Sequence, residues 1–219
     1  MTTALDYRDG LAVLTLGDDE NRFSPDWLEA VDAHLDQVEE QARGLITVGD
    51  GKFYSNGLDL DWLMSHGDRA DWYVARVQAL FARILTFPLP TVAAINGHAF
   101  GAGAMFAIAH DYRLMRTDRG YFCFPEVDIN IPFTPGMAAL IQAKLTPQTA
   151  VTAMTTGHRY TAEQALSGGV VDGAGPVDQL VDDAVAQLTP IAGKDRNTLA
   201  AIKSTMFAPA VAALAQGRG

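Results

Sequence analysis

Runs of apolar residues, separated by glycine, proline and acidic turns, divide the chain into short strands and helices. Runs of apolar and β-branched residues predict strands at 11–16, 44–48, 91–95 and 112–115. Apolar residues that recur every three or four positions predict a helix from Ser24 to Ala42, and further helices are expected at 70–85, 102–110 and 136–145. The repeated order of strand, turn and helix favours an α/β fold built from stacked units.

The chain changes character after residue 160. Helical patterns occupy 161–167, 177–188 and 196–214, and little strand signal is left there. We therefore expect one domain, with its core over 1–160 and a helical region over 161–219. The length of 219 residues and a composition of 48% hydrophobic and 19% charged residues fit a single folded domain.

The net charge of −10 is distributed unevenly, because residues 1–72 carry 16 acidic and only 5 basic side chains. Much of this acid falls on the predicted outer face of the helix that begins at Ser24. The chain has no cluster of lysine and arginine, so nucleic-acid binding is excluded. The uncharged run 84–109 is interrupted by proline and glycine, so no membrane span is expected. With no targeting signal and a single cysteine, Cys123, we expect a cytoplasmic protein.

Two glycine-containing turns are candidates for a ligand site, because small residues let a ligand approach the backbone. One turn is 55–60 (SNGLDL), and the other is 101–104 (GAGA), which opens a predicted helix. Amide groups at a helix start are unpaired and suit a developing negative charge. Glu126 lies in an apolar stretch, where a carboxyl group should have a raised pKa and can serve as a base.

The remaining reactive side chains are interpreted as structural. Cys123 lies in an aromatic strand, where a buried and unreactive thiol is expected. His98 is interpreted as a structural residue, and His110 and His158 lack partners at ligand spacing, so no metal site is predicted. Asp59 is expected to cap or solvate its segment, and a second acid role for it stays open.

Four segments together resemble the crotonase, or enoyl-CoA hydratase/isomerase, superfamily. They follow one another in order and at family spacing: 51–60 (GKFYSNGLDL), 90–103 (PTVAAINGHAFGAG), 109–112 (AHDY) and 124–132 (FPEVDINIP). The resemblance extends from about residue 5 to residue 170. It implies a spiral of strand–strand–helix units with a C-terminal helical region. It also implies an acyl-CoA thioester substrate, so coenzyme A arrives with the substrate and no separate cofactor is expected.

The resemblance further implies an oxyanion hole, formed around the thioester carbonyl by the backbone amides of Leu58 and Ala102. Lys52, with Lys203 as a second candidate, would hold the phosphates of coenzyme A. The residues expected to contact the CoA ester are Lys52, Ser55, Asn56, Gly57, Leu58, Asp59, Leu60, Gly101 and Ala102. Family members usually form trimers or dimers of trimers, so a homotrimer or a dimer of trimers is expected here too.

The choice of reaction depends on the number of catalytic carboxylates. Hydratases of the superfamily carry two glutamates, at the positions that Met105 and Glu126 occupy in this chain. A single glutamate is similar to the pattern of the Δ3,Δ2-enoyl-CoA isomerases, in which one carboxylate moves a proton from C2 to C4. The resemblance therefore implies conversion of a 3-enoyl-CoA to a 2-enoyl-CoA. Hydration or thioester hydrolysis through another acid such as Asp59, and acyl-CoA binding without catalysis, remain as alternatives.

Overall fold

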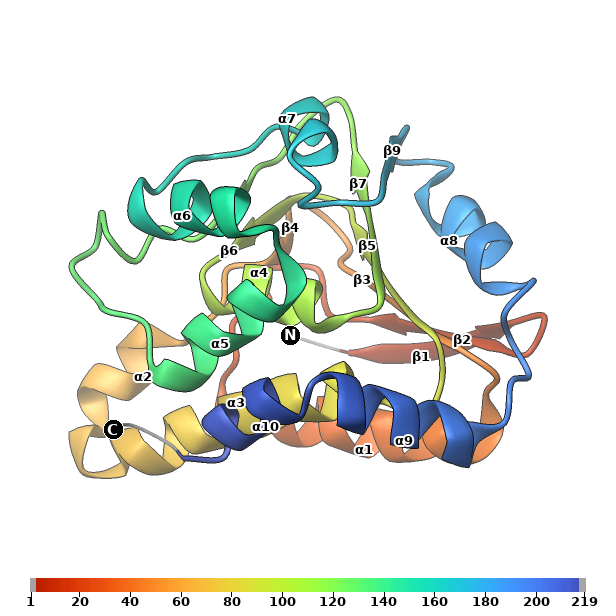
Figure 1. Ribbon diagram of the computed structural model, residues 1–219, viewed down its shortest axis with the longest axis horizontal. Helices are drawn as coiled ribbons and strands as arrows, with labels where there is room; N and C mark the ends of the chain where they lie inside the picture. The colour runs from red at the N-terminus through yellow and green to blue at the C-terminus, as the bar shows by residue number, and fades with distance from the viewer. Residues whose placement is uncertain (1–2, 217–219) are drawn as a thin grey trace.

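Three consecutive pairs of strands give the fold its spiral form (Figure 1). The computed structural model describes residues 3–216. The first strand of each pair belongs to a six-stranded sheet of order β1-β2-β3-β5-β7-β9, and the second belongs to a three-stranded sheet of order β4-β6-β8. Strands β1 and β2 pair antiparallel, and the other neighbours pair parallel. The strands are β1 (Ala4–Arg8), β2 (Leu11–Thr15), β3 (Leu45–Val48), β4 (Phe53–Ser55), β5 (Thr91–Ile95), β6 (His98–Phe100), β7 (Tyr112–Arg116), β8 (Phe122–Cys123) and β9 (Gly173–Gly175).

Helices connect the strand pairs and cover the sheets. The first part of the chain contributes α1 (Pro25–Gln41), α2 (Leu60–Ser65), the 3-10 turn η1 (Gly67–Arg69), α3 (Ala70–Leu85) and α4 (Ala102–Ala109). The second part contributes α5 (Pro135–Lys144), α6 (Pro147–Thr155), α7 (Ala162–Ser167), α8 (Leu180–Leu188), α9 (Arg196–Met206) and α10 (Ala208–Leu214). The alternation of strand pairs and helices confirms the predicted α/β spiral of strand–strand–helix units.

Helix α1 begins where its sequence signals place it. The Ser24 side chain accepts a hydrogen bond from the backbone N–H of Trp27, and Pro25 occupies the first helical position. The acidic face of this helix was predicted to be fully solvated, but part of it contacts α3. Arg83 of α3 pairs with Asp36 at 2.6 Å and with Glu39 at 2.7 Å, so part of the acidic surface joins the two helices.

The main hydrophobic core is built around α4, whose eight residues are all buried. Aromatic rings pack against it from several elements: the Phe106 ring lies 5.9 Å from that of Phe23 and 6.3 Å from that of Tyr54. A second, smaller core lies between α8 and the other face of the six-stranded sheet. Helix α4 is therefore fixed by packing on every side.

Several short elements differ from the predictions. The segment 96–103, whose glycines indicate a turn that leads into the helix at 102–110, contains strand β6, and β1, α2 and α6 were not predicted. The helical region after residue 160 also holds β9, which pairs with β7. The helix predicted over 196–214 is two helices, because Pro209 cannot continue a helix interior but fits the first turn of α10.

The C-terminal helices return to the first part of the chain. Helix α10, drawn in dark blue across the lower half of Figure 1, packs against α5 and α3. Within residues 3–216, no helix is long and apolar enough to cross a membrane. The division at residue 160, the oligomeric state and the cytoplasmic location stay predictions.

Candidate active site

The turn after β4 lies directly against the start of α4. Gly57 has a φ of +78°, and a Cβ placed on it would lie 2.8 Å from the backbone nitrogen of Ala102. The buried side chain of Ser55 stabilises the turn: its hydroxyl donates to the Asn21 carbonyl at 2.7 Å and accepts from the Gly57 N–H at 3.1 Å. Only glycine fits this position, for both conformational and steric reasons.

The start of α4 is equally tight. Gly101 has a φ of +52°, and its carbonyl accepts the first helical hydrogen bond, from Met105. Within residues 3–216, neither the Leu58 nor the Ala102 amide donates a hydrogen bond to another protein group. The contact through Gly57 therefore brings two free N–H groups to one place, one from the turn and one from the helix.

Glu126 reaches this place from the segment after β8. Its side chain is buried, with 8% exposure, and Oε1 lies 3.4 Å from the position that a Cβ on Gly101 would take. Oε2 is buried and has no hydrogen-bond partner among the described residues. Burial raises the pKa of Glu126 to about 7, in agreement with the expectation from its apolar neighbours. A carboxyl group with this pKa can exchange a proton near neutral pH.

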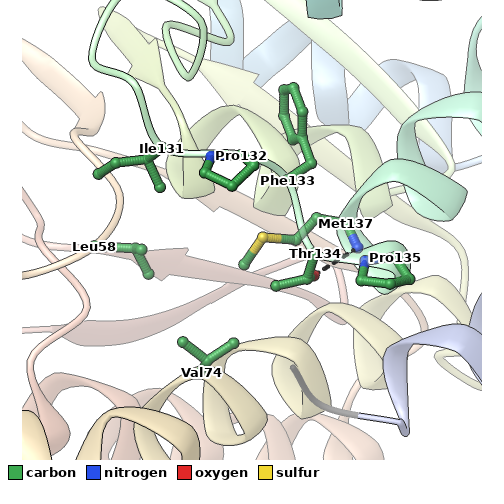
Figure 2. A pocket seen from close by; sticks show the side chains of 8 residues that line it. All are labelled: Leu58, Val74, Ile131, Pro132, Phe133, Thr134, Pro135 and Met137. Atoms are coloured by element: carbon green, nitrogen blue, oxygen red, sulfur yellow. Dashed lines mark hydrogen bonds between the residues drawn. The ribbon is translucent and has the colours of Figure 1, made fainter. Parts of the chain in front are cut away.

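The two amides and the carboxyl group line one cleft of about 220 Å³. Its walls are formed by Arg22, Asn56, Leu58, Leu60, Phe100, Gly101, Ala102, Pro125, Glu126, Ile129 and Ile131. An apolar pocket of about 270 Å³ shares Leu58 and Ile131 with this cleft. Figure 2 shows that Met137 points its thioether into this pocket, toward Leu58 and Val74, whereas the ring of Phe133 points away.

Comparisons with known proteins identify the family of this chain. The family model described as enoyl-CoA hydratase/isomerase matches residues 6–219. The chain belongs to the enoyl-CoA hydratase/isomerase family. It is 42% identical over 179 residues to enoyl-CoA delta isomerase 3 of Arabidopsis thaliana, an alignment that covers 78% of this chain and 75% of the relative.

Solved structures of this family share the fold. The apo structure of an enoyl-CoA isomerase from Mycobacterium tuberculosis has a TM-score of 0.89 and 25% identity, and the match covers 97% of this chain and 93% of that one. The human mitochondrial delta3-delta2-enoyl-CoA isomerase has a TM-score of 0.88 at 22% identity, with 98% and 86% covered. The chain is thus an enzyme of the crotonase superfamily, and the relatives support an enoyl-CoA isomerase or hydratase activity.

Most of the residues predicted from the enoyl-CoA hydratase/isomerase motifs meet at the cleft. Asn56, Leu58, Leu60, Gly101, Ala102 and Glu126 line it. Ser55 and Gly57 are buried behind the turn and shape it from there. Lys52 is exposed and lies outside the residues that line the cleft, with its ammonium 5.2 Å from the centre of the Phe53 ring.

Two of the polar residues considered for chemistry in this family have structural roles here. The Asp59 carboxylate caps α2 by accepting from the Trp62 N–H at 3.0 Å, as expected for a capping residue. Lys203, which we expected as a second phosphate ligand, is buried with 5% exposure. It pairs with Asp111 at 2.6 Å and donates to the Leu89 carbonyl at 2.9 Å, so that expectation was wrong.

The reading of Cys123 is confirmed: burial raises its pKa to about 11, and its thiol donates to the Gly157 carbonyl at 3.3 Å. No group of metal ligands occurs within residues 3–216.

Sequence reasoning missed the cleft residues that long-range contacts bring in. Arg22 is the clearest case, because its backbone forms a bridge to Gly57, 35 positions away. Its guanidinium pairs with Glu20 at 2.5 Å and with Asp61 at 3.5 Å. No local signal distinguishes this arginine from a surface residue before a helix. Phe100 was missed for a similar reason, since its strand β6 was interpreted as part of a turn.

Proposed function

We propose that the protein is a Δ3,Δ2-enoyl-CoA isomerase in which Glu126 carries one proton between two carbons of the substrate. Glu126 removes a proton from C2 of a 3-enoyl-CoA thioester, and a dienolate forms. The same carboxyl group then returns the proton at C4, which leaves the conjugated 2-enoyl-CoA. One carboxyl group serves as base and then as acid, so no second acid is needed.

The two free amides support stabilisation of the dienolate. Negative charge develops on the thioester oxygen when the C2 proton leaves. Each well-aimed donor in a site with little water is worth roughly 3 kcal/mol in such a transition state. The Leu58 and Ala102 amides are unpaired in the described chain and belong to one cleft with Glu126.

The presence of a single carboxyl group in the cleft is the observation that carries the proposal. Met105 stands where a hydratase of the family has its second glutamate, and it is buried in the core with 1% exposure. Asp59, the other acid considered, is engaged as the cap of α2. Hydration requires one group to activate water and another to protonate carbon, and this cleft offers only one such group.

The surroundings suggest where the rest of the substrate lies. The apolar pocket of Figure 2 adjoins Leu58 and Ile131, and it suits the acyl chain beyond C4. Lys52 is exposed and directly precedes β4, the strand before the turn with Leu58, so its ammonium group is available to a phosphate of coenzyme A. In this arrangement the thioester carbonyl lies at the two amides and C2 faces Glu126.

The test is conversion of a 3-enoyl-CoA to its conjugated isomer, followed by the absorbance of the product. The Glu126→Gln variant keeps the size of the side chain and cannot accept the proton, so we expect a loss of at least about 10³-fold in kcat. Asp128→Asn is the matched control, because Asp128 lies two positions away and is exposed. Equal activity of wild type and Glu126→Gln would overturn the mechanism.

Two further measurements separate the alternatives. Formation of 3-hydroxyacyl-CoA from a 2-enoyl-CoA at the rate of isomerisation would favour a hydratase instead. A protein that only binds acyl-CoA would bind the ester without exchanging the C2 proton in deuterated water. We expect exchange at C2 in the wild type and none in Glu126→Gln.

A further inference from the structure

A fully buried chain of hydrogen bonds joins α4, which begins at Ala102, to β4, the strand that leads into the turn with Leu58. His110 at the end of α4 contacts the carbonyl of Phe106 through Nδ1 at 2.9 Å and the hydroxyl of Thr47 through Nε2 at 3.0 Å. The Thr47 hydroxyl in turn lies 2.7 Å from the hydroxyl of Tyr54 on β4. All four residues have 0% exposure, and the mechanism uses none of them.

The partners determine the direction of every hydrogen bond in this chain. A carbonyl can only accept, so Nδ1 of His110 carries the proton and donates to Phe106. Nε2 must then accept from the Thr47 hydroxyl, and the Thr47 oxygen accepts from Tyr54. Burial lowers the pKa of His110 to about 3, and nearby Arg113, Lys144 and Lys203 act in the same sense. The imidazole therefore stays neutral and the order of donors does not change near neutral pH.

The two ends of the hydrogen-bond chain lie at the same sequence distance from the two amides. Tyr54 precedes Leu58 by four residues, and Phe106 follows Ala102 by four residues, which is about one helical turn. The pairing of β4 with β6 shifts its register between Phe53 and Ser55, at Tyr54 itself. The backbone ladder is therefore irregular where the Tyr54 side chain is anchored, and the side chain supplies a link that the ladder does not.

The glycine contacts and the hydrogen-bond chain restrain opposite movements. The contact of Gly57 with Ala102 limits how closely the turn can approach α4. That contact is repulsive at short distance and does not prevent the two elements from separating. The bonds from Phe106 through His110 and Thr47 to Tyr54 resist separation. Together they hold the spacing between the two amides within a narrow range.

We infer that His110, Thr47 and Tyr54 are positioning residues, whose buried hydrogen-bond chain sets the spacing of the Leu58 and Ala102 amides in the oxyanion hole. This inference rests on the proposed function of those amides. A small misplacement of groups that act in the transition state can reduce the rate by as much as about 10²-fold without changing substrate binding.

Thr47→Val is the decisive variant, because valine has the shape of threonine and lacks the hydroxyl that links both neighbours. We expect kcat to fall about 10-fold or more, with KM changed less than about 2-fold. Thr47→Ser keeps the hydroxyl and should restore most of kcat. Thr91→Val is the matched control, since Thr91 is a buried threonine of β5 whose hydroxyl accepts from the Asp111 N–H at 2.8 Å, outside this chain of bonds. It should lower the melting temperature and leave kcat unchanged.

A spectroscopic measurement separates positioning from stability. The carbonyl stretch of bound, isotope-labelled 2-enoyl-CoA reports how strongly the two amides polarise the thioester. We expect a smaller shift from the free-ligand frequency in Thr47→Val, and the wild-type shift in Thr47→Ser and Thr91→Val. If Thr47→Val does not fold, Tyr54→Phe removes the outer hydroxyl and is measured in the same way.

The outcomes distinguish this inference from the proposed function. A wild type with neither isomerase activity nor a carbonyl shift would contradict the proposed oxyanion hole itself. A wild type with both, together with folded Thr47→Val or Tyr54→Phe that has the same kcat and the same shift, would overturn the positioning role alone.

Discussion

Replacing Glu126 with glutamine should stabilise the folded protein at alkaline pH while it removes activity. The folded state holds the pKa of this carboxyl at about 7, against an ordinary value of 4.5, because burial disfavours the charged form. The folded state therefore binds the proton more tightly than the unfolded state. The stability linked to this proton is fully present below about pH 4.5 and is lost as the pH rises through about 7.

The size of the effect follows from the two pKa values. The gap between about 7 and 4.5, at about 1.4 kcal/mol for each tenfold change in proton affinity, corresponds to about 3 kcal/mol. The side chain is only 8% exposed, so solvent screens little of this cost. Glutamine is neutral at every pH, so the variant does not have this free-energy cost of a buried charge.

Urea unfolding at pH 4 and pH 8 measures the prediction. The difference in unfolding free energy between Glu126→Gln and wild type should move by about 3 kcal/mol in favour of the variant between these two values. Other ionisable groups are common to both proteins and cancel in the difference. The kcat/KM of the wild type should rise over the same range, with an apparent pKa near 7, because in the proposed mechanism the free carboxylate is the base. A difference in stability that stays constant with pH would refute the assignment of a desolvated carboxyl group.

Two further predictions test the frame of the site. Gly57→Ala should lower kcat by about 10²-fold, because the new methyl group pushes the turn away from α4. Gly169→Ala is the control: its φ is +67° and no atom lies within 4 Å of the added Cβ, so it should lower stability and leave kcat unchanged. Steady-state kinetics of the two variants measure the difference. Lys203→Met should reduce the unfolding free energy by about 3 kcal/mol in urea, since it leaves the Asp111 carboxylate in a largely buried position without its partner, and kcat should not change. Restoration of stability in the double variant with Asp111→Asn is expected, and its absence would argue against the ion pair.

The parts of the fold that sequence predicts well are those with local causes. Helix α1 was predicted because Ser24 and Pro25 mark its start and an apolar stripe continues it. The raised pKa of Glu126 was predicted from its apolar neighbours in sequence, and Pro125, Ile129 and Ile131 do line the same cleft. The capping role of Asp59 has a similar origin, since its partner Trp62 lies three residues away.

The features that the sequence does not predict depend on residues far apart along the chain. Strand β9 has the sequence of a turn, Gly173–Gly175, and becomes a strand because β7 offers it a free edge. Lys203 resembles a surface lysine in its helical pattern, yet its ammonium group meets Asp111, 92 positions earlier. His110 has no polar neighbour at a revealing spacing, and the hydroxyl that binds it lies 63 positions away on β3. Only the spiral brings these groups together.

The two ends of α4 explain how one apolar helix can serve the chemistry. At its C-terminal end the backbone is neutralised, since the His110 carbonyl accepts from Lys144 at 2.8 Å and from Arg113 at 3.0 Å. Among the described residues, its first amide, at Ala102, has no such partner. The positive end of the helix dipole therefore faces the cleft, and the negative end faces cations. All eight residues of α4 are buried, so packing holds the helix in place, and in the proposed mechanism its free first amide is available to the thioester oxygen of the substrate.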